Sequence, residues 1–97
     1  MPNSAALKDD LEEKITEVIR LLEKEINSRE RRMGVYKKLL KAYSESLEEC
    51  KKGNFEKVYI NGSVRFYYDS MVELNEELLN KMGEAIHEWE LLRVTRG

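Results

Sequence analysis

Residues 27–34, which read Asn-Ser-Arg-Glu-Arg-Arg-Met-Gly, decide the fold because they interrupt an otherwise regular helical pattern. On both sides of this stretch, apolar residues recur every three or four positions, which is the spacing of one face of an α-helix. Within it, Arg29 occupies the position where the next apolar residue would fall. The fold therefore depends on whether one helix continues through residues 27–34 or two helices meet there.

Two structures fit this interruption. In the first, a single helix runs from about residue 4 to about residue 52, with a weak point at Gly34, since glycine costs about 1 kcal/mol relative to alanine inside a helix. In the second, the helix breaks and Asn27 caps a new one, with Glu30 completing a capping box. We favour the continuous helix, because a reversal usually needs a loop of about two to five residues, often with glycine, and residues 27–32 contain none.

The C-terminal part of the sequence contains a second helical stripe, and we expect Asp69 or Ser70 to cap its helix. The sequence thus predicts an all-α fold, a single helical domain over residues 1–97 arranged as a long antiparallel helical hairpin. A first helix broken near residues 27–34 would give three helices instead. The second stripe advances in steps of three and four through Met71, Leu74, Leu78, Met82, Ala85, Trp89 and Leu92.

Residues 57–67, between the two stripes, fit two local structures. Asn61-Gly62, flanked by β-branched and aromatic residues, is typical of the two-residue turn of a small β-hairpin. Alternatively the last helix begins early, at Ser63, because the residues that follow continue the second stripe. We favour the early helix, because hairpin pairing would place Val58 opposite Arg65 and would not sort apolar and polar side chains onto separate faces.

The order helix, residues 57–66, helix resembles the β-type prefoldin subunit, in which two coiled-coil arms are joined through a β-hairpin. The resemblance implies an oligomeric, chaperone-like protein. The sequence departs from that pattern in the spacing between tyrosine and glycine and in its unequal helix lengths. The likeness covers about a dozen residues, so we do not assign the chain to this family.

A continuous first helix has a consequence for assembly. At about 1.5 Å per residue it would be about 70 Å long, and the shorter last helix would cover only part of it. The early part of its apolar stripe would then be exposed and would act as an association surface. We therefore expect a two-fold homodimer. The residues expected to mediate self-association are Leu7, Leu11, Ile15, Val18 and Leu22.

Charge is distributed unevenly along the chain, whose formal net charge is −2. Residues 27–52 carry eight cations and four anions, whereas each flanking part carries a net charge of −3. A basic helix segment at residues 29–41 could contact nucleic-acid phosphates, although lysine and arginine on a helix more often form its solvated face. The candidate contact residues are Arg29, Arg31, Arg32, Lys37, Lys38 and Lys41.

Few residues suggest catalysis or metal binding. Glu84 and His87 have the Glu-x-x-His spacing that places two metal ligands on one helix face, but no inward glutamate accompanies them. Cys50, the only cysteine, falls on the apolar stripe, where a small buried residue suits packing. A Cys50–His87 nucleophilic pair would need the two helix ends to meet. We therefore expect no enzyme, no cofactor and no metal site.

The sequence therefore favours a non-enzymatic helical module that acts by oligomerisation or by binding a protein partner, as an adaptor does. The alternative is a small nucleic-acid-binding or regulatory protein that uses residues 29–41. A cytoplasmic location is expected, because the N-terminus lacks a signal-peptide pattern and a lone cysteine forms no internal disulfide. No apolar run approaches the roughly 18 to 20 residues that a membrane span requires, so no membrane partner is expected.

Overall fold

The computed structural model describes residues 4–28, 33–70 and 74–96 and confirms the all-α fold. No strand occurs in these three ranges, and no helix within them is long and apolar enough to cross a membrane. The principal axes span 44 × 20 × 19 Å. The helices are α1 (Ser4–Ser28), α2 (Met33–Lys51), α3 (Ser63–Asp69) and α4 (Glu76–Arg96), with a short 3-10 turn η1 (Phe55–Lys57) between α2 and α3.

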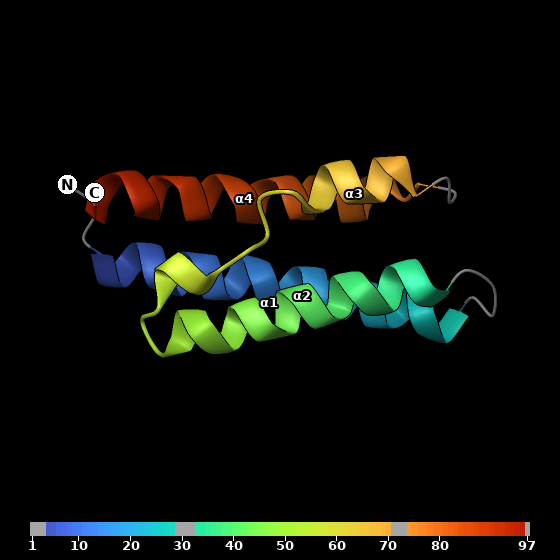
Figure 1. Cartoon of the computed structure of the whole chain (residues 1–97), viewed down its shortest axis with the longest axis horizontal. Helices are drawn as coiled ribbons and strands as arrows, with labels where there is room; N and C mark the ends of the chain where they lie inside the picture. The colour runs from blue at the N-terminus through green and yellow to red at the C-terminus, as the bar shows by residue number, and fades with distance from the viewer. Residues whose placement is uncertain (1–3, 29–32, 71–73, 97) are drawn as a thin grey trace.

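Helix α1 is the central element, because α2 packs along one side of it and α4 along another (Figure 1). The Nζ of Lys8, near the start of α1, donates a hydrogen bond to the carbonyl oxygen of Lys51, the last residue of α2, over 3.2 Å. The two helices are therefore antiparallel, and the chain reverses between them. The favoured continuous helix is wrong and its alternative, a broken first helix, is confirmed.

The reversal has a physical reason in the apolar stripe of α1. An unbroken helix would leave much of that stripe in water, whereas folding α2 back against α1 buries it within one chain. Four residues without glycine, 29–32, separate the two helices. These residues and the side chain of Ser28 lie outside the described part of the structure. The helix cap expected at Asn27 is wrong, because Asn27 lies within α1 and α2 begins at Met33. Its expected capping-box partner, Glu30, is among the residues outside the described ranges.

Residues 54–62, which we call the strap, lead from the end of α2 to the start of α3 (yellow in Figure 1). Val58 and Ile60 are buried, whereas Tyr59 between them is exposed, so alternate side chains of this extended segment point into the bundle. The backbone N–H of Tyr59 donates to the hydroxyl of Ser46 on α2 over 3.2 Å rather than to a second strand. The strap therefore replaces the β-hairpin, and the likeness to prefoldin loses its basis.

Helix α3 begins at Ser63, as the early-helix alternative predicted, but it ends at Asp69. The last helix, α4, starts only at Glu76, so the caps expected at Asp69 and Ser70 are wrong. Its cap is Asn75, whose side-chain oxygen accepts a hydrogen bond from the backbone N–H of Leu78 over 3.1 Å. Residues 71–73, including Met71 of the second stripe, lie outside the described ranges.

Candidate protein-interaction surface

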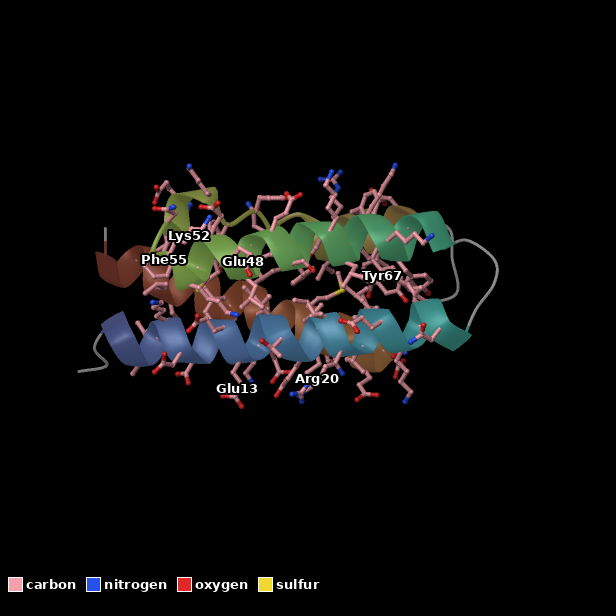
Figure 2. The ribbon with its side chains drawn as sticks, turned by 90° about the horizontal axis from the view of Figure 1, so that it is seen from below. Glu13, Arg20, Glu48, Lys52, Phe55 and Tyr67 are labelled. Atoms are coloured by element: carbon pink, nitrogen blue, oxygen red, sulfur yellow. The ribbon has the colours of Figure 1, made fainter. Side chains whose placement is uncertain are left out.

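The five residues expected to mediate self-association lie in the core of one chain. Their side chains are at most 5% exposed, because α2 and α4 pack over them. The exposed stripe that motivated the dimer is therefore absent, and the homodimer stays a prediction without this interface. The charged side chains of Glu13 and Arg20, also on α1, point away from the bundle (Figure 2). The buried five are Leu7, Leu11, Ile15, Val18 and Leu22.

The basic segment is only partly described. Lys37, Lys38 and Lys41 are exposed on α2, whereas Arg29, Arg31 and Arg32 lie outside the described residues. Tyr36, the tyrosine among these cations, is buried and unable to stack on a base, because its ring packs edge-on against Tyr67 with the centroids 5.8 Å apart. The structure thus places three of the six candidate cations on the surface.

The Glu-x-x-His pair on α4 is exposed, and its glutamate is already engaged. The carboxylate of Glu84 lies 3.3 Å from Lys14 Nζ of α1 and 3.5 Å from Lys81 Nζ. The hydrogen bond from Lys14, with the positive charges of both lysines, lowers the pKa of Glu84. In the part of the chain that the structure describes, no group of three or more His, Cys, Asp or Glu residues gathers as metal ligands would.

Cys50 is buried at the end of α2, as its position on the stripe predicted. Burial, together with the negative charge of Glu12, raises the pKa of its thiol to about 11. A nucleophilic cysteine needs the opposite shift, because the thiolate is the reactive form. Cys50 therefore acts as a small apolar core residue in this fold.

An apolar hollow lies between α2, the end of the strap and the start of α3. It has a volume of about 230 Å³. Tyr59 and Phe66 form its walls and remain 48% and 40% exposed. We call this hollow the aromatic groove; its lining residues are Lys38, Leu39, Ala42, Tyr59, Gly62, Ser63 and Phe66.

Tyr59 is held in position at both ends. Its backbone N–H donates to Ser46, and its phenolic hydroxyl donates a short hydrogen bond to the carboxylate of Glu45, one helical turn from Ala42. The bond to the negatively charged Glu45 raises the pKa of Tyr59 to about 12. The ring is thus ordered before any ligand arrives, which lowers the entropic cost of binding.

A chain of buried hydroxyl groups fixes the floor of the groove. The hydroxyl of Ser63 donates to the carbonyl oxygen of Ile60 over 2.7 Å, and that of Tyr43 lies 2.6 Å from Ser63 Oγ. Because serine has a single hydroxyl proton, Tyr43 must donate to Ser63. This arrangement joins α2 to the first residue of α3, so the two walls of the groove cannot separate easily.

The rim carries positive charge. Lys38 is the one charged residue of the lining, and it forms no ion pair within the described part of the chain. Two other cations of this region are paired: Lys41 Nζ lies 4.0 Å from Glu45, and Arg65 Nε lies 3.8 Å from Asp69. Lys38 is therefore the cation that a bound negative group could neutralise.

Sequence reasoning missed the aromatic groove, although one signal for it was present. Phe66, Tyr67 and Tyr68 are consecutive aromatic residues, and neighbours on a helix point about 100° apart, so three in a row cannot all face one core. The structure buries Tyr67 inside the bundle (Figure 2) and leaves Phe66 and Tyr68 exposed. Of the two exposed rings, Phe66 is a wall of the groove.

Comparisons with known proteins add no assignment. No protein-family model matches the sequence, and neither the curated proteins nor the solved structures gave a match. Function must therefore be inferred from the surface itself.

Proposed function

We propose that this chain is a non-enzymatic helical interaction module that binds a protein partner through the aromatic groove. The observation that carries the proposal is that Tyr59 and Phe66 are exposed around an apolar hollow. Their neighbours are buried in the core, namely Val58, Ile60 and Tyr67. Aromatic side chains are enriched in protein interfaces, where ordered rings provide large contact areas and often dominate affinity.

The test begins with a peptide-display library panned against the intact protein, followed by fluorescence anisotropy with the selected peptides. Removing either aromatic wall, by Tyr59→Ala or Phe66→Ala, should weaken binding at least about tenfold, as is typical of interface hot spots. Val94→Ala is the matched control, since it removes an exposed apolar side chain (75% exposed) from α4. Circular dichroism melts establish that each variant is folded.

Two results would contradict the proposal: a library that yields no binder, or binders whose affinity is unchanged by both aromatic substitutions. The same protein samples also report on oligomerisation, because light scattering after size exclusion measures their mass directly. A homodimer, if present, is expected to use an exposed surface rather than the buried stripe of α1.

A second candidate function, binding of single-stranded nucleic acid, is favoured by one observation. Exposed Lys37, Lys38 and Lys41 lie on α2, whose residues also line the aromatic groove, and cations beside aromatic rings are typical of single-strand binding surfaces. Glu45 and Asp69 in the same region oppose phosphate. Salt-dependent binding of an oligonucleotide, lost on Lys37→Ala with Lys38→Ala, would support this candidate.

A further inference from the structure

We infer that the occupant of the aromatic groove is a short acidic peptide segment that inserts one large apolar side chain and places a carboxylate against Lys38. This inference rests on the proposed function and names the chemistry of its partner. Three properties of the groove carry it: its size, its apolar lining and its single uncompensated charge.

The size of the groove fits one side chain. Its volume is about 230 Å³, and a cavity of about 150 Å³ in a protein is known to hold benzene. One leucine or phenylalanine side chain therefore fits, whereas a whole helix face does not. The expected ligand is a peptide with a single anchor residue, in contrast to an amphipathic helix with several.

The lining determines which part of the ligand enters. Leu39, Ala42 and Phe66 present carbon atoms, and the polar groups nearby already have partners. The Ser63 hydroxyl bonds to Ile60 and Tyr43, and the Tyr59 hydroxyl bonds to Glu45. A polar or charged ligand group in the hollow would lose its water without gaining a hydrogen bond, which is unfavourable. The inserted group should therefore be apolar.

The rim determines what flanks the inserted group. Lys38 has no acidic partner among the described residues, whereas Lys41 and Arg65 are each near a carboxylate of their own. A carboxylate on the bound peptide would neutralise Lys38, and a cation there would be repelled. The same charge would also attract phosphate, but a nucleobase is a polar ring that the apolar lining would leave without hydrogen bonds, so we favour the peptide.

The experiment uses three synthetic fluorescein-labelled peptides with the same central leucine or phenylalanine and with Asp/Glu, Ser or Lys on both sides. Anisotropy titrations with the full chain should rank the acidic peptide first and the basic peptide last. Lys38→Glu should weaken the acidic peptide about three- to tenfold and improve the basic one, as expected for a charge pair at an interface rim. Raising the salt concentration from 0.05 to about 0.5 M should reduce the difference between the peptides.

The matched control is Lys52→Glu, which makes the same charge change at an exposed lysine that does not line the groove. It should leave the ranking of the peptides unchanged. Phe66→Ala separates binding in the groove from the preference for an acidic peptide, because it removes a groove wall and keeps Lys38. Loss of all three peptides in Phe66→Ala, together with a ranking that depends on Lys38, supports the inference.

Other outcomes overturn it in distinguishable ways. If all three peptides bind equally and only Phe66→Ala weakens them, the interaction module stands and the acidic ligand is wrong. If no peptide binds and an oligonucleotide does, the occupant is a nucleic acid. If light scattering shows a dimer that Phe66→Ala dissociates, the occupant is a second copy of this chain. Binding that is insensitive to Phe66→Ala contradicts the proposed function itself.

Discussion

At the scale of single residues, the buried hydroxyl groups of Tyr43 and Ser63 do not contribute equally to the stability of the fold. Burial is the main reason that the pKa of Tyr43 is raised, so its hydroxyl stays protonated and donates to Ser63. Tyr43→Phe removes that donor and leaves Ser63 bonded to Ile60. Ser63→Ala, in contrast, leaves the buried hydroxyl of Tyr43 without its acceptor. The Tyr43 hydroxyl therefore depends on Ser63 as its acceptor, whereas the Ser63 hydroxyl keeps its bond to Ile60 without Tyr43.

We expect Ser63→Ala to lower the free energy of unfolding by about 1–3 kcal/mol and Tyr43→Phe by only about 0.5–1.5 kcal/mol, because an unsatisfied buried donor costs more than a lost hydrogen bond. Adding Tyr43→Phe to Ser63→Ala should recover part of the stability. Urea titrations followed by circular dichroism measure all three. A larger loss for Tyr43→Phe would contradict the assigned direction of donation.

Cys50 gives a second prediction at this scale. Its pKa, raised to about 11 from 9.0 by burial and by Glu12, leaves about 100-fold less thiolate at pH 8 than an ordinary cysteine has. The folded protein should therefore react with a disulfide reagent such as DTNB at least about 100-fold more slowly than the same protein in 6 M urea. Equal rates in the two conditions would show that the thiol is accessible.

At the scale of elements, Asn75 joins α4 to the other helices. Its side-chain oxygen caps α4, its amide nitrogen donates to the carboxylate of Glu25 on α1 over 2.8 Å, and its backbone N–H donates to the Tyr67 hydroxyl over 2.9 Å. The Tyr67 hydroxyl in turn lies 3.2 Å from that of Tyr36 on α2. One polar cluster therefore connects α1, α2, α3 and α4 at this end of the bundle.

Asn75→Ala should destabilise the protein by about 2 kcal/mol or more, because it removes both a cap and a partner of the buried Glu25. Asn75→Asp keeps the cap but places a second carboxylate beside Glu25. Repulsion raises carboxyl pKa values in the folded state, so the loss of stability should be largest at neutral pH and should diminish as the pH falls. Urea midpoints at pH 4 and pH 7 test this, and a pH-independent loss would contradict it.

The element scale also shows where sequence reasoning succeeds and fails. Spacing of apolar residues located α1, α2 and the core side of α4, because periodicity follows directly from which face is buried. It identified residues 27–34 as the place where the first helix could break but favoured a continuous helix, since a charged segment without glycine resembles a solvated helix face. It placed the last cap at Asp69 or Ser70, because the apolar stripe continues back through Leu74 and Met71, although the capping bond from Leu78 to Asn75 spans only three residues. The aromatic groove was missed because its walls meet only in the folded chain.

At the scale of the whole molecule, α1 and α4 are also joined on their outer sides by ion pairs. Lys81 Nζ lies 3.1 Å from Glu17 and 3.5 Å from Glu84, and Lys14 reaches the same Glu84. The hydrogen bond and the negative charge of Glu17 raise the pKa of Lys81, whereas Lys14 lowers that of Glu84. The paired side chains are 27–44% exposed, so solvent screens these pairs and their contribution to the packing of α4 against α1 is small.

The sign of each shift predicts the dependence of stability on pH. The contribution of Glu84 is present above the ordinary carboxyl pKa of about 4.3 and is lost as the pH falls through its lowered value. That of Lys81 is present below its ordinary pKa of 10.5 and is lost as the pH rises through its raised value. Glu84→Gln should therefore reduce the acid-side fall of the urea midpoint slightly, and about 1 M NaCl should weaken the effect. An unchanged pH profile would show that these pairs do not contribute.

The burial of Ile15 tests the entire arrangement, because this side chain is completely enclosed by the helices of one chain. Ile15→Glu would place an unpaired charge in the core and should abolish cooperative unfolding, and Ile15→Ala should cost about 2–5 kcal/mol. Arg20→Glu is the control, since it also adds negative charge to α1 but at an exposed position. Circular dichroism and light scattering distinguish the outcomes. If Ile15→Glu were folded and smaller in mass than the wild type, the stripe of α1 would be an interface between copies, because only there could the charge reach water after dissociation.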